Sequence, residues 1–244
     1  MAVDDVLEFD SGCLTLGIKP NSLQLEQFEI YFSELQLWNS RTNLTSITDR
    51  EGIFIRHFLD SLTLLPVLCG LPLDDGLNLV DIGSGAGFPG LALKIMRNDI
   101  KLTLLEATGK KVRFLEHMVQ TLGLDGVEVI HGRAEELAHQ TRHRQSYRVV
   151  TARAVAALPA LAELALPLCR PGGIFMAMKK GEMQAEIIAA AKAARLMGGA
   201  LERQITIDLP GLHDGRSLII YSKRSATPAA YPRRSGLPAK NPLI

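Results

Sequence analysis

Apolar residues recur at helical spacing in the first part of the chain, between residues 20 and 70. After Asn21 and Ser22, which are typical of a helix start, apolar side chains follow every three or four residues. They are Leu25, Phe28, Phe32, Leu35 and Trp38. A second apolar stretch opens with a capping-box pattern at residues 48–51, led by Thr48, and ends near Pro66. The pattern predicts a helical cap over residues 22–72, whereas residues 1–21 carry few periodic signals.

From residue 77 onward, short apolar runs alternate with helical patterns. Strands are predicted at residues 77–82, 101–106, 127–131, 148–151, 173–178, 204–209 and 218–222. Helices are predicted at residues 90–97, 110–122, 134–138, 158–169 and 182–197. This alternation predicts an α/β fold with a seven-stranded, doubly wound sheet that is mostly parallel. Only a short turn separates the last two predicted strands, so we expect an antiparallel last strand.

Two further segments complete the organisation. Residues 71–76, Leu-Pro-Leu-Asp-Asp-Gly, have the composition of a linker, and residues 224–244 contain four prolines and no acid. We expect this tail to be extended or disordered. The chain therefore divides into an extension (1–21), the helical cap (22–72), an α/β domain (73–223) and a basic, proline-rich tail (224–244).

The α/β domain begins with a glycine loop. Residues 77–90 are L-N-L-V-D-I-G-S-G-A-G-F-P-G, which places Gly83, Gly85 and Gly87 between a predicted strand and a predicted helix. Glycines let a backbone turn tightly and approach a ligand, and this layout is typical of nucleotide-binding loops. Residues 85–90 also match the G-x-G-x-x-G dinucleotide fingerprint. The loop alone leaves both a dinucleotide and S-adenosylmethionine open.

Residues beyond the loop favour S-adenosylmethionine. Glu106 ends the next strand, where a carboxylate binds the ribose hydroxyls of either cofactor. Asp81 precedes the first glycine, where an acid is expected near the amino group of S-adenosylmethionine. Ala134 and Glu135 follow the third strand and can present an N–H and a carboxylate to an adenine edge, although Glu135 also suits a helix N-terminus. A seven-strand sheet with a terminal hairpin favours the same cofactor.

Composition and charge narrow the class further. Cys13, Cys69 and Cys169 lie far apart and form no C-x-x-C pair, which argues against a metal centre or a disulfide and fits the cytoplasm. The acidic N-terminus has no signal-peptide pattern, and the apolar runs fall short of the ~20 residues of a membrane span. Net charge is only +1, but the chain has six basic residues and no acid from Gly215 to its end. Such clustering indicates a polyanionic partner.

Taken together, several motifs resemble the small-subunit ribosomal RNA methyltransferase G family, also called glucose-inhibited division protein B. The resemblance covers residues 22–244. The segments that carry it are W-N…N-L-T at 38–45, H-F-L-D-S-L at 57–62, the glycine loop from 81 to 90, G-R-A-E at 132–135, T-A-R-A-V-A at 151–156, and Y-P-R-R…P-A-K-N-P at 231–242.

This resemblance implies a Rossmann-like methyltransferase that moves a methyl group from S-adenosylmethionine to N7 of a guanine in 16S ribosomal RNA. It implies a 30S particle or assembly intermediate as the substrate, and residues 1–21 as a variable extension. We expect a monomer. The cofactor residues it implies, together with the glycines of the loop, are Gly83, Gly85, Gly87, Phe88, Glu106, Ala134, Glu135 and Arg153. Thr108 and Gly109 depart from the Asp/Ser-rich turn expected after Glu106.

The residues agree with chemistry at a ring nitrogen. N7 of guanine carries a free lone pair, so its methylation needs alignment and exclusion of water but no general base. The sequence has no Pro-Cys pair for 5-methylcytosine chemistry, and residues 151–154 are not the Pro-Pro-aromatic cluster of amino-group methylation. Arg153 is the one candidate catalytic residue. It can serve guanine O6, the cofactor carboxylate or a structural ion pair.

We expect a looped-out guanine as the target, because the major groove of A-form RNA is too narrow to be read. Candidate RNA contacts are Arg41, His57, Lys110, Lys111, Lys179, Lys180, Arg233, Arg234 and Lys240. Two other functions stay open on the residues alone. One is a nicotinamide-dependent oxidoreductase, which shares the glycine pattern, and the other is a non-catalytic RNA-binding assembly factor.

Overall fold

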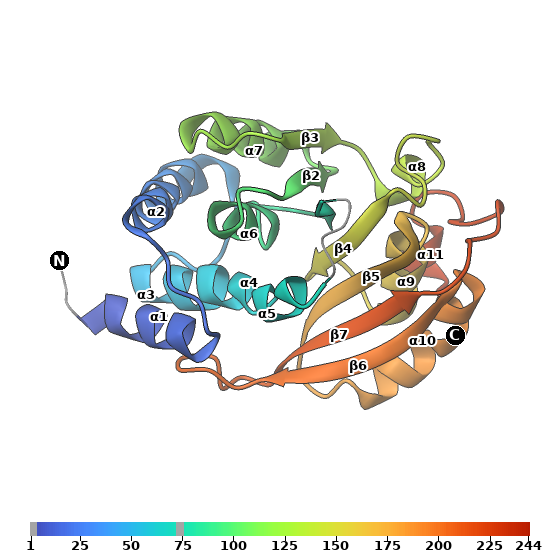
Figure 1. Cartoon of the computed structure of the whole chain (residues 1–244). Helices are drawn as coiled ribbons and strands as arrows, with labels where there is room; N and C mark the ends of the chain where they lie inside the picture. Colours follow the sequence, from blue (N-terminus) through green and yellow to red (C-terminus); the bar gives the residue numbers. More distant parts are fainter. Residues whose placement is uncertain (1–3, 72–75) are drawn as a thin grey trace.

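Seven strands form one mixed sheet in the part of the chain that the structure describes, residues 4–71 and 76–244 of a computed structural model (Figure 1). The strands are β1 (Asn78–Ile82), β2 (Lys101–Glu106), β3 (Val127–His131), β4 (Tyr147–Arg153), β5 (Cys169–Lys180), β6 (Gly199–Ile207) and β7 (Arg216–Lys223). Their order is β3-β2-β1-β4-β5-β7-β6, and β7 runs antiparallel to both of its neighbours. The predicted fold class and the closing hairpin are confirmed.

Helices cover both faces of this sheet (Figure 1). On one face lie α2 (Ser22–Thr42), α6 (Gly90–Met96) and α7 (Gly109–Thr121). On the other lie α8 (Ala134–Leu137), α9 (Leu158–Ala165), α10 (Gln184–Leu196) and α11 (Leu237–Lys240). Neighbouring residues of β1 point to opposite faces, so Leu79 joins the first buried cluster and Val80 the second. Both faces of this central parallel strand are therefore buried.

Several predicted boundaries differ from the structure by a few residues, and two of these differences have a local cause. Helix α9 ends at Ala165, before the predicted residue 169, because Pro167 follows its C-cap and cannot continue a helix. Strand β6 begins at Gly199, earlier than the predicted residue 204. Residues 201–204 are exposed, three of them are polar, and a bulge between Leu201 and Arg203 interrupts the pairing of β6 with β7. Polar edge strands lack the apolar alternation by which the others were predicted.

A helix that the sequence did not predict precedes the cap. Helix α1 spans Asp4–Thr15, and its Phe9 and Cys13 are buried against the cap. The ring of Phe9 meets Phe28 at 5.7 Å and Phe54 at 5.5 Å, both edge to face. Two buried positions make too short a stripe to be recognised as periodic, which explains why this helix was missed.

The second part of the cap is a continuous helical run. It comprises α3 (Arg50–Ile53), the π-helical turn η1 (Phe54–Leu59), α4 (Asp60–Leu62) and α5 (Leu65–Cys69). The N-cap is Asp49, not Thr48 as the capping-box pattern predicted, and its carboxylate accepts from the Gly52 N–H at 2.6 Å. Arg50–Cys69 is long and apolar enough to span a membrane, with a mean hydropathy of 1.4, contrary to our expectation. Because 83% of that window is buried inside the protein, it is a core helix.

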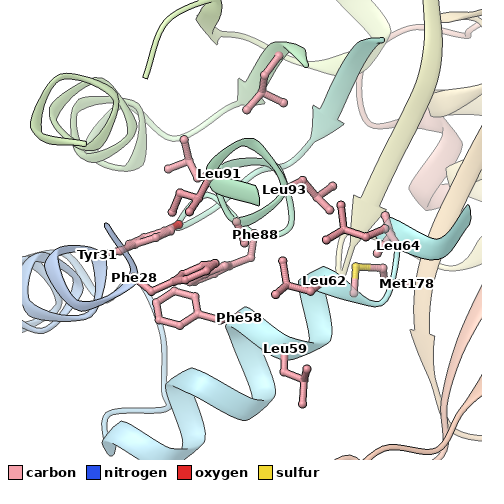
Figure 2. Close-up of a cluster of buried hydrophobic side chains, with 14 of the residues drawn as sticks. Phe28, Tyr31, Phe58, Leu59, Leu62, Leu64, Phe88, Leu91, Leu93 and Met178 are labelled. Carbon is pink, nitrogen blue, oxygen red and sulfur yellow. The ribbon is translucent and has the colours of Figure 1, made fainter. Parts of the chain in front are cut away.

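An aromatic cluster joins the cap to the glycine loop (Figure 2). Phe28 and Tyr31 of α2 and Phe58 of η1 surround Phe88, which belongs to the loop. Tyr31 stacks on Phe88 with centroids 5.1 Å apart and planes 10° apart. One buried cluster runs from α1 and α2 to the sheet, so the cap and the loop share a core.

The tail is ordered against the sheet domain, so the expectation of an extended or disordered tail is wrong. Arg144 donates to the main-chain carbonyls of Thr227, Pro228 and Tyr231 at 2.8–3.0 Å, and His139 Nε2 lies 2.8 Å from the Pro232 carbonyl. These anchors lie some ninety residues away in sequence, so no local pattern reveals them. The predicted linker at 71–76 falls mostly on residues 72–75, which lie outside the described part of the chain.

Candidate active site

The predicted cofactor residues meet at the carboxyl edge of the sheet. Strands β1, β2, β3 and β4 run parallel and end side by side, in a register that pairs Ile82 with Leu105 and Glu106 with His131. The strand ends and the segments that follow them carry the predicted residues Gly83, Gly85, Gly87, Phe88, Glu106, Ala134, Glu135 and Arg153. Ligands of open α/β sheets bind in such a crevice outside the strand ends.

Glu106 ties the glycine loop to β2. Its two carboxylate oxygens accept from the Gly85 N–H at 2.9 Å and from the Thr108 N–H at 2.7 Å. The Leu105 carbonyl accepts from the Gly83 and Ser84 N–H groups at 2.8 and 3.1 Å. A carboxylate has about four acceptor positions, so Glu106 retains capacity for ribose hydroxyls. Thr108, which departs from the expected turn, serves here through its backbone.

The glycines of the loop are required by their conformation and by their neighbours. Gly85 and Gly87 have φ angles of 61° and 93°, a region that favours glycine. A Cβ at Gly87 would collide with the Tyr31 hydroxyl, which donates to the Ala86 carbonyl. A Cβ at Gly83 would lie 2.7 Å from a methyl group of Val155, which follows β4. A ligand can therefore approach the backbone of the loop closely, but the loop has no room for side chains at these positions.

Asp81 does not face this crevice. Its side chain is fully buried and accepts from the Gly90 N–H and the Thr151 hydroxyl, each at 3.1 Å. Burial raises the pKa of Asp81 to about 7, although these hydrogen bonds and Arg153 act to lower it. The expectation that Asp81 lies near the amino group of the cofactor is therefore corrected. Asp81 fixes the start of α6 against β4.

A pocket of about 200 Å³ lies between the ends of β1, β2 and β3. Its lining includes Gly83, Leu105, Ala134, Glu135 and Val155. It is smaller than the ~300–1,000 Å³ of a site for a whole small ligand, so it suits one heterocyclic ring. Apolar walls and a carboxylate at the rim fit an adenine with its amino group. The residues present thus fit S-adenosylmethionine.

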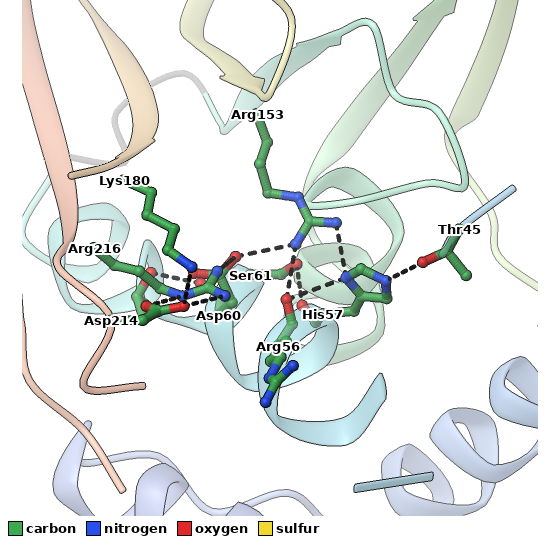
Figure 3. A network of polar contacts seen from close by, with 10 residues as sticks. Thr45, Arg56, His57, Asp60, Ser61, Arg153, Lys180, Asp214 and Arg216 are labelled. Carbon is green, nitrogen blue, oxygen red and sulfur yellow. Dashed lines mark hydrogen bonds and ion pairs between the residues drawn. The ribbon is translucent and has the colours of Figure 1, made fainter. Parts of the chain in front are cut away.

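A second pocket, of about 340 Å³, opens at the ends of β4 and β5. Arg153, the last residue of β4, lines it and contacts the cap through a network of polar contacts (Figure 3). Its guanidinium contacts Asp60 Oδ2 at 3.0 Å, the Arg56 carbonyl at 3.3 Å and His57 Nδ1 at 3.2 Å. It also lies over the Phe88 ring, 5.0 Å from the centroid. Residues 153–156 run from this second pocket to the smaller one.

We call this second pocket the basic pocket because five cations line it. Asp60 is the one carboxylate among the lining residues. The cations are Arg56, Arg153, Lys179, Lys180 and Arg216. Asp60 is almost fully buried and pairs with both Arg153 and Arg216, the latter at 2.7 Å. The net positive charge favours an anionic ligand.

His57 is held neutral in this wall. Burial and the charge of Arg153 lower its pKa to about 3, against an opposing hydrogen bond with the Arg56 carbonyl. Its ring stacks on Phe88 with centroids 4.7 Å apart, and its Nε2 lies 2.7 Å from the Thr45 hydroxyl. His57 Nδ1 lies 3.1 Å from the Arg56 carbonyl, which accepts, and 3.2 Å from the Arg153 guanidinium, which donates, so one tautomer of the neutral ring can bond only one of the two.

The other predicted RNA residues fall into two groups. Arg41, Lys110, Arg234 and Lys240 are exposed, and Lys111 is half-buried at the start of α7. Three are tied to carboxylates: Lys179 to Glu186, Lys180 to Asp214 and Arg233 to Glu163. Arg233 bonds both oxygens of the fully buried Glu163, so it has an internal role instead of the surface role that we expected.

Three residues of the site escaped the sequence analysis. Tyr31 lies beside Phe32 but was not a member of the predicted apolar stripe, and Arg216 opens the last strand with no motif around it. Asp60 lies in the H-F-L-D-S-L segment, where its spacing from His57 on one helix was the available signal. Within residues 4–71 and 76–244, no group of three or more His, Cys, Asp or Glu side chains is placed to hold a metal ion.

Known proteins resemble this chain in sequence over most of its length. A family model described as rRNA small subunit methyltransferase G matches residues 24–209. The ribosomal RNA small subunit methyltransferase G of Dehalococcoides mccartyi (strain CBDB1) is 53% identical over 233 residues, which cover 96% of this chain and 97% of the relative. The protein of the same name from Staphylococcus carnosus (strain TM300) is 43% identical, with 92% of each chain covered.

Solved structures share the fold at low sequence identity. The putative methyltransferase complexed with the Haloferax volcanii Trm112 activator matches with a TM-score of 0.52 and 16% identity. The match covers 79% of this chain and 98% of that one. The CurJ carbon methyltransferase matches with a TM-score of 0.55 and 13% identity, over 82% of this chain and 61% of that one. These matches identify a Rossmann-like methyltransferase fold.

Proposed function

The chain belongs to the ribosomal RNA small subunit methyltransferase G family, and from this premise we propose that it methylates N7 of a guanine in 16S ribosomal RNA. Members of this family are S-adenosylmethionine-dependent ribosomal RNA methyltransferases, so the methyl donor and the RNA class follow from membership. Membership also sets aside the nicotinamide oxidoreductase. The choice of N7, the residues that serve it and the form of the substrate are our proposal.

The observation that carries the choice of N7 is the state of the two possible bases in the basic pocket. Asp60 is engaged by two arginines, and His57 has a pKa of about 3. An efficient general base has a pKa near the operating pH, so His57 does not suit proton removal near neutral pH. The Asp60 carboxylate is held by two guanidinium groups. Methylation of an exocyclic amino group releases a proton, whereas N7 accepts a methyl group on its free lone pair. A pocket without a usable base therefore favours N7.

For the cofactor we propose these roles. S-adenosylmethionine supplies a methyl group bonded to a positively charged sulfur. Glu106 holds the ribose, Gly83 and Gly85 allow close backbone approach, and Ala134 and Glu135 hold the adenine edge in the smaller pocket. Phe88, whose side chain is buried in the cap cluster, contributes through its backbone.

For the guanine we propose the basic pocket. Three of the N–H groups of Arg153 contact cap residues, which leaves donors on a guanidinium that has five. We assign one of them to guanine O6. Lys110, Lys111, Arg41, Arg234 and Lys240 then bind phosphates around the crevice and set position, not sequence. We expect a monomer that acts in the cytoplasm on the 30S particle or an assembly intermediate.

The test is methyl transfer from labelled S-adenosylmethionine to 30S particles and to naked 16S RNA, both from cells that lack this protein. Nuclease digestion and chromatography identify the product. We expect N7-methylguanosine at one site, and none with the Glu106→Ala variant. A methyl group on an exocyclic nitrogen or on another base would refute the choice of N7. Sound RNA binding without transfer would instead indicate a non-catalytic assembly factor.

A further inference from the structure

The C-terminal strap, residues 231–241, lies across the smaller pocket. Two of its residues, Gly236 and Ala239, line that pocket together with Gly83, Ala134 and Glu135. The strap is thus part of the wall of the smaller pocket, in which we place the adenine ring. Residues 231–241 follow the last strand, so this wall comes from outside the strand-end loops that usually form such a crevice.

Glu135 connects the strap to the pocket. Glu135 is 8% exposed, and its carboxylate accepts from the Gly236 N–H at 2.8 Å. The neighbouring Glu136 accepts from the Ser235 hydroxyl at 3.1 Å. One bond from the strap orients the Glu135 carboxylate and leaves acceptor capacity for an amino group in the pocket. A single carboxylate therefore serves both the strap and the ring.

The strap is anchored by a buried ion pair. Arg233 bonds both oxygens of Glu163, which is fully buried in α9, and donates to the Asn241 carbonyl at 2.8 Å. The Arg233 N–H also donates to Glu163 at 2.8 Å. Such a bidentate pair closes the strap into a loop around Arg233 and fixes where Gly236 and Ala239 lie. The anchor has a positional role and does not reach the pocket itself.

We propose that the C-terminal strap is a structural part of the cofactor site, so that docking of the strap and binding of the adenine end of the cofactor stabilise each other. This inference rests on the proposed cofactor site. Linkage requires the effect to be reciprocal: a docked strap raises cofactor affinity, and bound cofactor holds the strap down.

The direct test fills the pocket from the strap side. Ala239 is exposed, so Ala239→Trp leaves the core intact but places a large ring at the pocket wall. The matched control is Ala229→Trp, the same change at an exposed tail position that is not among the pocket-lining residues. Titration calorimetry with S-adenosylhomocysteine should give at least a tenfold weaker Kd for Ala239→Trp and a Kd within twofold of wild type for Ala229→Trp.

A second measurement follows the strap itself. Hydrogen exchange at the Gly236 amide should slow at least fivefold when S-adenosylhomocysteine binds, while the exposed turn around Ala229 should not change. Arg233→Ala should abolish that protection and weaken binding of S-adenosylhomocysteine. Its control is the neighbouring Arg234→Ala, which removes an exposed charge and should leave the affinity for S-adenosylhomocysteine unchanged.

The outcomes separate two failures. If wild type binds S-adenosylhomocysteine, Glu106→Ala does not, and Ala239→Trp binds like wild type, the strap inference is overturned while the cofactor site stands. Unchanged exchange at Gly236 on binding overturns it in the same way. If wild type does not bind S-adenosylhomocysteine, the proposed cofactor site falls and the strap inference with it.

Discussion

The contact between Tyr31 and the glycine loop gives the sharpest prediction. Tyr31 is fully buried in α2, its ring stacks on Phe88, and its hydroxyl donates to the Ala86 carbonyl. Burial holds the pKa of Tyr31 well above its usual value, so the hydroxyl stays a donor at any working pH. Tyr31→Phe removes one oxygen and keeps the stacked ring, which isolates this hydrogen bond.

The magnitude follows from the carbonyl that loses its donor. A buried acceptor left without a partner costs about 1–3 kcal/mol, so the free energy of unfolding should fall by that amount. Because the carbonyl belongs to the glycine loop, the loop also loses a restraint. If ordering the loop for binding costs about 1 kcal/mol more in the variant, the Kd for S-adenosylhomocysteine rises roughly fivefold.

Urea unfolding and titration calorimetry measure the two effects, and Tyr147→Phe is the matched control. Tyr147 is also buried, and its hydroxyl lies 2.6 Å from His143 Nδ1 at the opposite edge of the sheet. We expect both variants to lose stability, but only Tyr31→Phe to lose affinity. Equal affinities for the two variants would refute the idea that the cap positions the loop.

The remaining predictions concern the basic pocket and the exposed cations. Asp60→Asn removes the charge shared by Arg153 and Arg216 and should lower the free energy of unfolding by about 3 kcal/mol, measured in urea; a loss below 1 kcal/mol would contradict a shared buried pair. Native His57 stays neutral until about pH 3, whereas this side chain is protonated near pH 6.5 in the unfolded chain. The free energy of unfolding of wild type should therefore fall by about 1 kcal/mol per pH unit, relative to that of His57→Gln, as the pH falls from 6.5 to 4. The raised pKa of Asp81 has the opposite effect on stability, but Asp81 is present in both proteins, so its contribution cancels. Arg234→Ala with Lys240→Ala should reduce the slope of log K for RNA against log salt by roughly 1.5, and an unchanged slope would remove both from the RNA surface.

Local patterns were enough for the sheet domain. The glycine loop and Glu106 belong to one strand–helix–strand unit, and parallel strands must bring their ends to one edge. The short connection before β7 similarly required a hairpin. For these elements the sequence neighbours are also the neighbours in space, so periodicity and turn chemistry predict the architecture.

The errors share a different cause. Arg233 looked like a surface cation because its partner, Glu163, lies seventy residues earlier, inside a helix that is otherwise apolar. Asp81 looked like a ligand contact because it precedes the first glycine, and the sequence pattern does not show that Gly90 and Thr151 donate to its carboxylate. The tail looked disordered because its anchors, Arg144 and His139, come from another segment. Pairings between distant segments are set by packing, which a single sequence does not display.

The proposed role of the strap also predicts an order of binding and release. Arg234 and Lys240 are exposed on either side of Gly236, so phosphates that bind them oppose any lifting of the strap from the pocket. A pocket that exchanges its contents only when the strap lifts is then slowest to exchange while RNA is bound. We therefore expect compulsory-order kinetics, in which the donor loads before the RNA and the spent donor departs after it. Product inhibition by S-adenosylhomocysteine should be competitive with the donor and persist longest on the RNA complex.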